Sequence, residues 1–169
     1  EIKAVSLTIE KYISFTIDNT IFLDSFNFLS TSLDKLVESN KDPKDALARF
    51  PLFYESFQTN YKRKTILLLL QKGIFPYEWY DIEGKLNESK LPEIEAFYSS
   101  LNECGISQEE YEHALLVWKK TGCQSFFDYL RLYLKTDVML LADVFEQFRN
   151  TAHKNYGLDP VKYFTLPGF

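Results

Sequence analysis

The sequence predicts a single, mostly helical α+β domain over residues 1–169, with a β-hairpin near its N-terminus. Alternating apolar and polar residues at 13–17 indicate the hairpin. Later segments have apolar residues spaced by three and four between N-cap and C-cap signals, which is typical of helices. Hydrophobic residues make up 46% of the chain and charged residues 25%, a composition that favours a folded globular protein over a disordered one.

The hairpin is expected to turn at Asp18-Asn19, a pair that tolerates positive φ. Its second strand is predicted from residue 21 to about residue 26 and carries Asp24 inside an apolar run. That carboxylate is expected to bond a backbone N–H or a hydroxyl, with metal binding as the alternative. The edge near residues 12–17 would be exposed, so a partner chain, a second copy of the chain or a rearranged helix must cover it.

Helices are predicted for most of the remaining chain. Ser30 or Ser32 can cap the first, Asp42-Pro43 opens the second, and capping boxes open the last two. The third contains four consecutive leucines, so a buried strand is its alternative, while residues 74–89 indicate an aromatic-rich loop. The predicted helices span residues 33–39, 44–50, 60–73, 92–101, 107–122 and 125–156.

The net charge of −5 and the pI near 5.1 argue against a free-standing nucleic-acid binder, because such proteins are usually basic. Any nucleic-acid contact must therefore use a local site. One candidate is the basic run at 62–64 after Tyr61, which can contact a phosphate backbone or be a solvated helix start. Another is the set of aromatic residues at 75–80, which can stack on unpaired bases or pack on the core.

The cysteines and the hydropathy pattern indicate an intracellular protein without a membrane segment. Cys104 and Cys123 are widely spaced, which favours reduced thiols over a disulfide framework or a zinc site. The longest apolar run, at 66–70, is far short of the roughly 20 residues of a membrane helix.

The predicted last helix contains one residue that its pattern does not explain. Asp137 lies on an otherwise apolar or aromatic stripe, where an unpaired ionised carboxylate is costly and tends to become protonated. By contrast, Asp143 and Glu146 fall on other faces of the helix and are expected to be solvated. The stripe consists of Leu130, Tyr133, Asp137, Leu140, Leu141, Val144 and Phe148.

Tyr133 precedes Asp137 by one helical turn, so the two side chains should lie one above the other. A carboxylate can bind a divalent cation while a phenol orients a nearby water molecule, and metal-assisted phosphodiester hydrolysis needs such a pairing. A simple Tyr–Asp hydrogen bond, or an aspartate that caps a helix break, is the alternative.

Seven segments follow one another in a recognisable order: EKYISF, FLDSFNFLSTSLDKLVES, KGIFPYEWYD, LPEIEAFYSSL, ISQEEYEHALLVW, DYLRLYLKTDVMLLADVFEQFR and YGLDPVKYFTLPGF. Together they resemble the type-B DNA polymerases of the protein-primed group, which occur in linear organellar plasmids, viruses and self-synthesising DNA transposons. The resemblance covers nearly the whole chain. It corresponds to the later part of the proofreading exonuclease domain, up to the start of the polymerase palm.

The resemblance implies a partial RNase H-like exonuclease fold, in which three acidic motifs hold two metal ions, Mg²⁺ or Mn²⁺. The third motif, Tyr-x-x-x-Asp on a helix, matches residues 133–137. Asp137 would then be a metal ligand and Tyr133 the residue that positions the attacking water. The first two motifs are expected upstream of the matched region, so at most one of four expected carboxylates falls within this sequence.

The same resemblance implies binding to a single-stranded DNA end and to the priming terminal protein. A Ser/Thr-Leu-x-x-apolar motif fits Ser32 and Leu33, with Ser25 as a rival by position. Lys72 is the candidate for a lysine that assists the exonuclease. The implied compartment is the nucleus, the mitochondrion or a viral factory.

Two functions are consistent with these observations. The chain is either a fragment of a proofreading exonuclease region, inactive in isolation, or a polymerase-derived domain kept for structural or protein-binding work. The Tyr133–Asp137 pair favours the first, whereas the acidic charge and the missing motifs favour the second.

Overall fold

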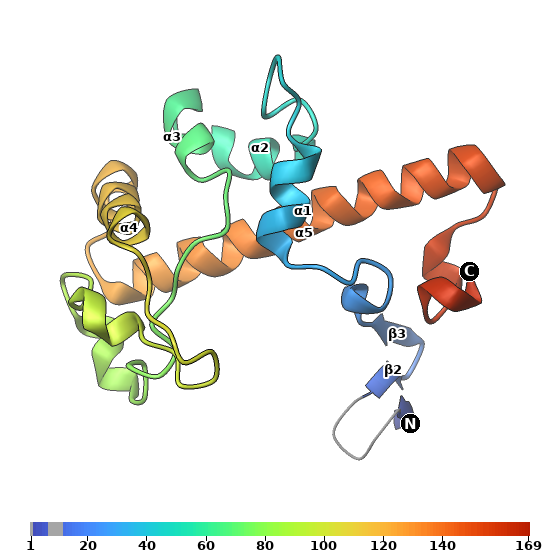
Figure 1. Ribbon diagram of the computed structural model, residues 1–169, viewed down its shortest axis with the longest axis horizontal. Coiled ribbons are helices and arrows are strands. Elements are labelled where there is room, and N and C mark those ends of the chain that lie inside the picture. Colours follow the sequence, from blue (N-terminus) through green and yellow to red (C-terminus); the bar gives the residue numbers. More distant parts are fainter. Residues whose placement is uncertain (1, 7–11) are drawn as a thin grey trace.

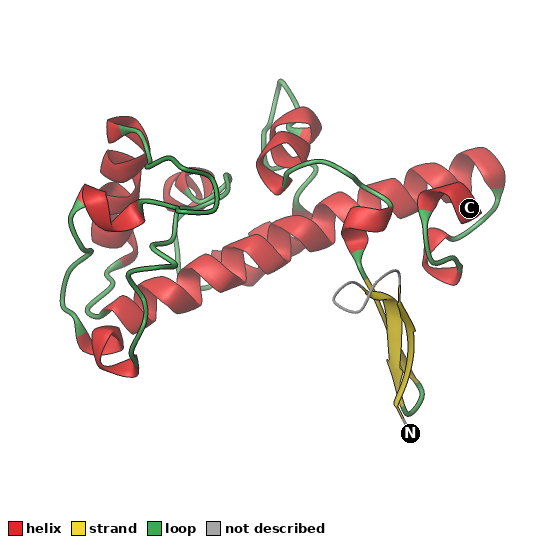
Figure 2. Cartoon of the chain, turned by 60° about the horizontal axis from the view of Figure 1, so that its bottom comes forward, coloured by secondary structure: helices red, strands yellow, loops and turns green. Residues whose placement is uncertain are grey.

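The computed structural model describes residues 2–6 and 12–169. A long helix, α5 (Phe126–Tyr156), is the axis of the molecule, and the other helices pack along it (Figure 1, Figure 2). The described elements before it are β1 (Ile2–Ser6), β2 (Tyr12–Ile17), β3 (Thr20–Leu23), α1 (Leu33–Asn40), α2 (Pro51–Gln58), α3 (Arg63–Leu68) and α4 (Gln108–Thr121). Short 3₁₀ turns lie at Ser25–Asn27, Glu83–Asn87, Ile94–Phe97, Pro160–Lys162 and Leu166–Gly168. The expected α+β class, mostly helical, is confirmed.

Helices α1, α4 and α5 begin where the sequence predicts. Ser32 caps α1, and capping boxes at Ser107 and Ser125 open α4 and α5, so that backbone N–H groups of each first turn have a partner. Gly122 and Gly157 end α4 and α5 at φ of 75° and 69°, a left-handed conformation that glycine adopts without steric cost.

The N-terminal sheet has three antiparallel strands in the order β1-β2-β3. The predicted β2–β3 hairpin is confirmed, with a turn residue, Asp18, at a φ of 51°. Strand β1 pairs with β2 on the side opposite β3, so the chain itself covers the edge that was expected to need a partner chain or a second copy. That expectation is wrong because the short run Ile-Lys-Ala-Val-Ser has only a weak strand pattern of its own, and pairing with β2 defines it.

Strand β3 ends earlier than predicted because Asp24 starts a turn. Its Oδ1 accepts the backbone N–H of Phe26 at 2.9 Å and caps the 3₁₀ turn Ser25–Asn27. The carboxylate therefore has the backbone partner that was expected from its position.

Helices α1 and α2 pack on α5, and α3 bridges α2 and α4. The loop predicted at 74–89 is confirmed apart from one 3₁₀ turn, and most of its rings pack on the core, as in the contact of Trp79 with Phe126 at 5.1 Å between centroids. Tyr77 is the exception and is 67% exposed. The largest fully buried apolar side chains are Phe50, Phe53, Phe57, Phe126, Ile66, Leu140 and Val37.

The helix predicted at residues 44–50 is wrong, and a helix begins only after it. Asp42 and Asp45 accept backbone N–H groups two and three residues ahead of them, and such local bonds favour turns over a helix. Pro51 then opens α2, which was not expected from the sequence. Proline suits a first helical position because it has no N–H to satisfy.

Two other predicted helices are shorter than expected. Within residues 60–73 only Arg63–Leu68 is helical, and the alternative of a buried strand there is wrong. After α3 the chain crosses α5, where the Tyr129 hydroxyl donates to the carbonyl of Ile74 at 2.8 Å. Within residues 92–101 only one 3₁₀ turn forms. Tertiary contacts, rather than local preference, decide where these segments end.

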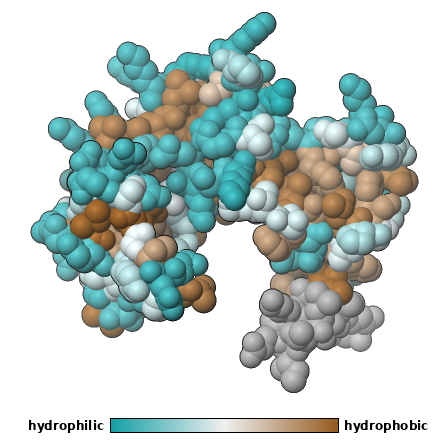
Figure 3. Space-filling view, in the orientation of Figure 1, coloured by the Kyte–Doolittle hydropathy of each residue, from teal (hydrophilic) through white to brown (hydrophobic). Residues whose placement is uncertain are grey.

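On the face shown in Figure 3, a hollow lies between the end of the molecule that carries α4 and the end that carries the C-terminal part of α5. In residues 2–6 and 12–169, no helix combines the length and the apolar character that crossing a bilayer requires. Cys104 is exposed and Cys123 half-buried, and both are free thiols, as the sequence predicts.

Candidate functional site

Tyr133 lies in the middle of α5 and is almost completely buried, with 7% of its surface exposed. Its ring stacks on Phe75 with 5.2 Å between centroids, and its hydroxyl hydrogen-bonds the hydroxyl of Tyr77. Burial, followed by these hydroxyl contacts and the nearby Asp137, raises the pKa of the Tyr133 phenol far above its ordinary value. The phenol is therefore neutral at any physiological pH and can orient a partner by hydrogen bonding only.

Asp137 is half-buried one turn further along α5, and its Oδ1 is buried without a hydrogen-bond partner among the described residues. Burial raises the pKa of this carboxyl above its ordinary value, and the Tyr133 hydroxyl and the charge of Lys72 oppose that shift. A buried carboxylate oxygen is normally hydrogen-bonded or bound to a cation. Oδ1 of Asp137 is therefore the described atom best placed to accept a further partner.

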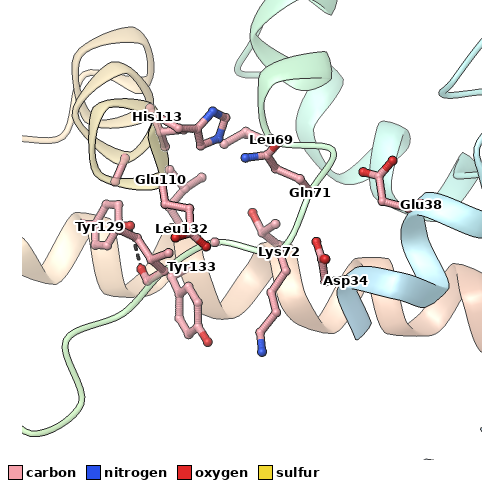
Figure 4. Close-up of a pocket in the computed structure, with 15 residues that line it drawn as sticks. Asp34, Glu38, Leu69, Gln71, Lys72, Glu110, His113, Tyr129, Leu132 and Tyr133 are labelled. Carbon is pink, nitrogen blue, oxygen red and sulfur yellow. Dashed lines mark hydrogen bonds between the residues drawn. The ribbon is translucent and has the colours of Figure 1, made fainter. Parts of the chain in front are cut away.

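Lys72 comes to the pair from the segment that crosses α5 after α3. Its charge acts on Asp137, and its side chain extends in the same direction as the ring of Tyr133 in Figure 4. Gly73 makes this approach possible, because a Cβ at that position would lie 3.0 Å from Cδ2 of Tyr133. The structure thus brings together three residues that the sequence singled out separately.

A cavity of about 170 Å³ lies beside this group, between α1, α4, α5 and the segment 69–74 (Figure 4). Tyr133 and Lys72 line it, whereas Asp137 is outside its lining. Thr136 also lines it, and its buried Oγ1 has no hydrogen-bond partner among the described residues; nothing in the sequence pattern pointed to this threonine. The polar residues that line the cavity are Asp34, Glu38, Gln71, Lys72, Glu110, His113, Tyr129, Tyr133 and Thr136.

A complete metal centre is not formed by the described residues, which contain no group of three or more His, Cys, Asp or Glu side chains placed to hold an ion. Asp137 fits a single ligand of a hard cation, since its carboxylate oxygen is available. Asp24, the other candidate ligand, uses its Oδ1 to accept a backbone N–H.

The predicted DNA-contacting residues Ser25, Ser32 and Leu33 have structural contacts. The Oγ of Ser32 accepts the N–H of Lys35 at 3.4 Å as the cap of α1, and Leu33 packs against the core. Ser25 lines a groove of about 490 Å³ between the sheet and α5. Of the predicted nucleic-acid residues, only Lys72 has a described interaction with Asp137.

Asp143 was expected to be solvated, and this is wrong. It is 2% exposed, and its oxygens accept the N–H groups of Leu52 at 3.1 Å and Phe53 at 2.8 Å, so it caps α2 from another helix. Helix α2 has Phe50 at its N-cap, which offers no capping oxygen. The absence of a capping side chain at Phe50 was the only local sign that a residue distant in sequence caps α2. Glu146, by contrast, is half-exposed and pairs with Arg149.

No family model, curated protein or solved structure matches this chain.

Proposed function

We propose that this chain is a fragment or derivative of the proofreading exonuclease region of a protein-primed type-B DNA polymerase, with a partial RNase H-like fold. In the parent protein, Tyr133 and Asp137 belong to a site that hydrolyses single-stranded DNA ends. The isolated chain is inactive because it supplies one metal-binding carboxylate.

The observation that carries the proposal is the buried, unpartnered Oδ1 of Asp137. The Tyr133 hydroxyl and the Lys72 charge favour the ionised carboxylate, but a buried carboxylate oxygen without a partner of its own destabilises a fold, so Oδ1 calls for a compensating role. A divalent cation would supply that compensation, and Mg²⁺ or Mn²⁺ at such a site lowers the pKa of bound water and neutralises phosphate charge. The remaining metal ligands would come from outside the 169 residues.

Two further residues support the same chemistry. The Tyr133 hydroxyl lies beside Asp137 and stays protonated, as a residue that orients a water molecule must. Lys72 brings a positive charge to the same place, which suits a site for an anionic phosphodiester. In this proposal Ser25, Ser32 and Leu33 contact the DNA strand or the priming protein.

A second function is favoured by exposed apolar side chains. Val138 on α5 and Ile21 on β3 are 56% and 58% exposed and line the same groove between the sheet and α5. Exposed apolar side chains that share one groove are typical of a contact with another protein. A polymerase-derived domain that binds a protein partner without catalysis would need this surface and not Asp137.

A nuclease assay tests the proposal directly. Purified chain and labelled single-stranded DNA, with Mg²⁺ or Mn²⁺, should show no trimming above background, because one carboxylate cannot position two cations. Metal-dependent trimming that disappears in Asp137→Ala would show that the isolated chain holds a working site, and the proposed incompleteness would be wrong.

The proposed role of Asp137 in the parent protein is tested by the same assay on a longer protein. If the reading frame that encodes the chain continues upstream, the extended protein should trim single-stranded DNA, and Asp137→Asn should abolish trimming because an amide is a poor cation ligand. An extended protein that contains an upstream Asp-x-Glu strand and retains its activity in Asp137→Asn would contradict the role of Asp137 and favour the interaction domain.

A further inference from the structure

A second polar groove, of about 580 Å³, lies on the opposite side of α5 from the Tyr133–Asp137 pair. Arg131 and Lys135 from α5 line it, one helical turn apart. Each is two residues from a member of the pair, a rotation of about 200° around the helix axis. The two sites therefore face in different directions.

The groove is formed where three parts of the chain meet. The turn after α2 contributes Asn60 and Tyr61, the end of α4 and the residues after it contribute Thr121 to Cys123, and α5 forms the floor of the groove. Basic residues flank these segments in sequence: Lys62 and Lys64 follow Tyr61 and are exposed, and Lys119 and Lys120 belong to the basic last turn of α4. Two basic side chains thus line the groove and four more lie within three residues of a lining residue, in a protein with net charge −5.

The positive charge of the groove is little neutralised within the described part of the chain. Asp128 is the one carboxylate in its lining. Oδ2 of Asp128 accepts the N–H groups of Gln124 and Ser125 at 3.0 and 3.1 Å, and the charge of Arg131 acts on this carboxylate without an ion pair. No ion pair joins any of the six basic residues to a described carboxylate. Arg63, in the same basic run, is different because it pairs with Asp45.

The cations in the groove lie beside aromatic rings. The Lys135 amine donates to the carbonyl of Ser56 and lies 4.5 Å from the ring centroid of Phe57, which fixes its position. Tyr61 lines the groove and is half-buried, and its ring packs on Phe57 at 6.1 Å. Cations beside an aromatic ring and the Asn60 amide match the phosphates and bases of a single strand better than they match the side chains of Asp and Glu in an acidic peptide, which have no rings to stack.

We propose that this groove binds single-stranded nucleic acid, with Arg131, Lys135 and the neighbouring lysines on the phosphates and Tyr61 on a base. The groove adds a binding surface to the exonuclease proposal and does not depend on it, because it uses neither Asp137 nor a metal ion. It also explains how an acidic protein contacts a polyanion, through a local concentration of charge.

Fluorescence anisotropy with a labelled oligothymidylate, in low salt with EDTA, tests the groove. Wild type should bind, and Arg131→Gln/Lys135→Gln should bind at least about fivefold more weakly, with a salt dependence smaller by about 1.4 in log–log slope. Lys62→Gln/Lys64→Gln should also weaken binding, and it leaves the described hydrogen bond and ion pair between Arg63 and Asp45 intact.

Lys154→Gln/Lys162→Gln is the matched control, since it removes the same charge from exposed residues at the other end of α5 and beyond it. The control should bind like wild type. The groove assignment fails if wild type does not bind, or if the control weakens binding as much as the groove variants do. Equal binding of poly-glutamate would assign the groove to acidic proteins instead.

Discussion

Asp137 and Asp143 lie six residues apart on α5, and the structure gives them opposite surroundings. Asp143 has two backbone N–H donors from the start of α2, whereas Oδ1 of Asp137 has none among the described residues. Burial is the largest influence on both and raises both pKa values. An aspartate therefore stabilises the fold at position 143, where backbone donors satisfy it, and is expected to destabilise the fold at position 137, where one buried oxygen lacks a donor.

Asp143→Asn should destabilise the fold by about 2 kcal/mol, because an amide nitrogen facing one of the two N–H groups leaves a buried donor unsatisfied. Urea denaturation of both proteins would measure the loss, with Asp137→Asn as a control that makes the same chemical change on the same helix. An Asp143→Asn variant as stable as wild type would show that the cap of α2 is dispensable.

The pH dependence of stability should also identify Asp137. Because burial raises its pKa in the folded state, the folded protein binds this proton more tightly than the unfolded chain does. The free energy of unfolding should therefore fall as pH rises from the unfolded pKa, about 3.9, to the folded pKa, and should change no further above it. Urea melts of wild type and Asp137→Asn across that range would isolate this contribution. Parallel curves would mean that Asp137 is as well solvated in the fold as in the unfolded chain.

At the scale of elements, the segment 69–74 positions the site by crossing α5 in close contact. Gly73→Ala should cost about 1 kcal/mol, because the added Cβ would lie 3.0 Å from the Tyr133 ring and the ring or the segment must shift. Gly105→Ala is the matched control, since a Cβ there has no neighbour within 4 Å. Thermal melts would compare the two variants, and equal melting temperatures would rule out close packing of this segment on Tyr133.

The elements that could be predicted are those whose signals are local. Ser107 and Ser125 each have a capping partner three residues on, and the glycines after α4 and α5 end those helices by conformation alone. Helix α2 was missed because its cap comes from Asp143, about 90 residues away in sequence. Strand β1 was missed for the same kind of reason, since only pairing with β2 defines it.

In the candidate site, too, the features with local signals could be predicted and those that depend on distant contacts could not. The pairing of Tyr133 with Asp137 needs only helical spacing, so the sequence was sufficient to predict it. Lys72 was predicted from the family resemblance alone, and only the crossing of segment 69–74 over α5 shows that its charge acts on Asp137. Thr136 and the cavity that it lines depend on the packing of α1 and α4, which no local pattern encodes.

At the level of the whole molecule, the proposed metal site and the proposed nucleic-acid groove lie on opposite sides of α5. The described residues supply one carboxylate suited to the proposed metal site, where several are needed. The fold does not need an ion for its stability, because aromatic packing along α5 and the Asp143 cap of α2 stabilise it. The central claim is that Asp137 is a metal ligand left without its partners.

Thermal melts of wild type and Asp137→Asn, each with and without Mn²⁺, test that claim most directly. Replacing a strained carboxylate by a neutral amide should leave stability unchanged or raise it by about 1 kcal/mol, a rise in Tm of about 2–4 °C for a chain of this size. Mn²⁺ should shift neither protein. A loss of several degrees in Asp137→Asn, or stabilisation of wild type alone by Mn²⁺, would contradict the claim and show that Asp137 already has its partners within this chain.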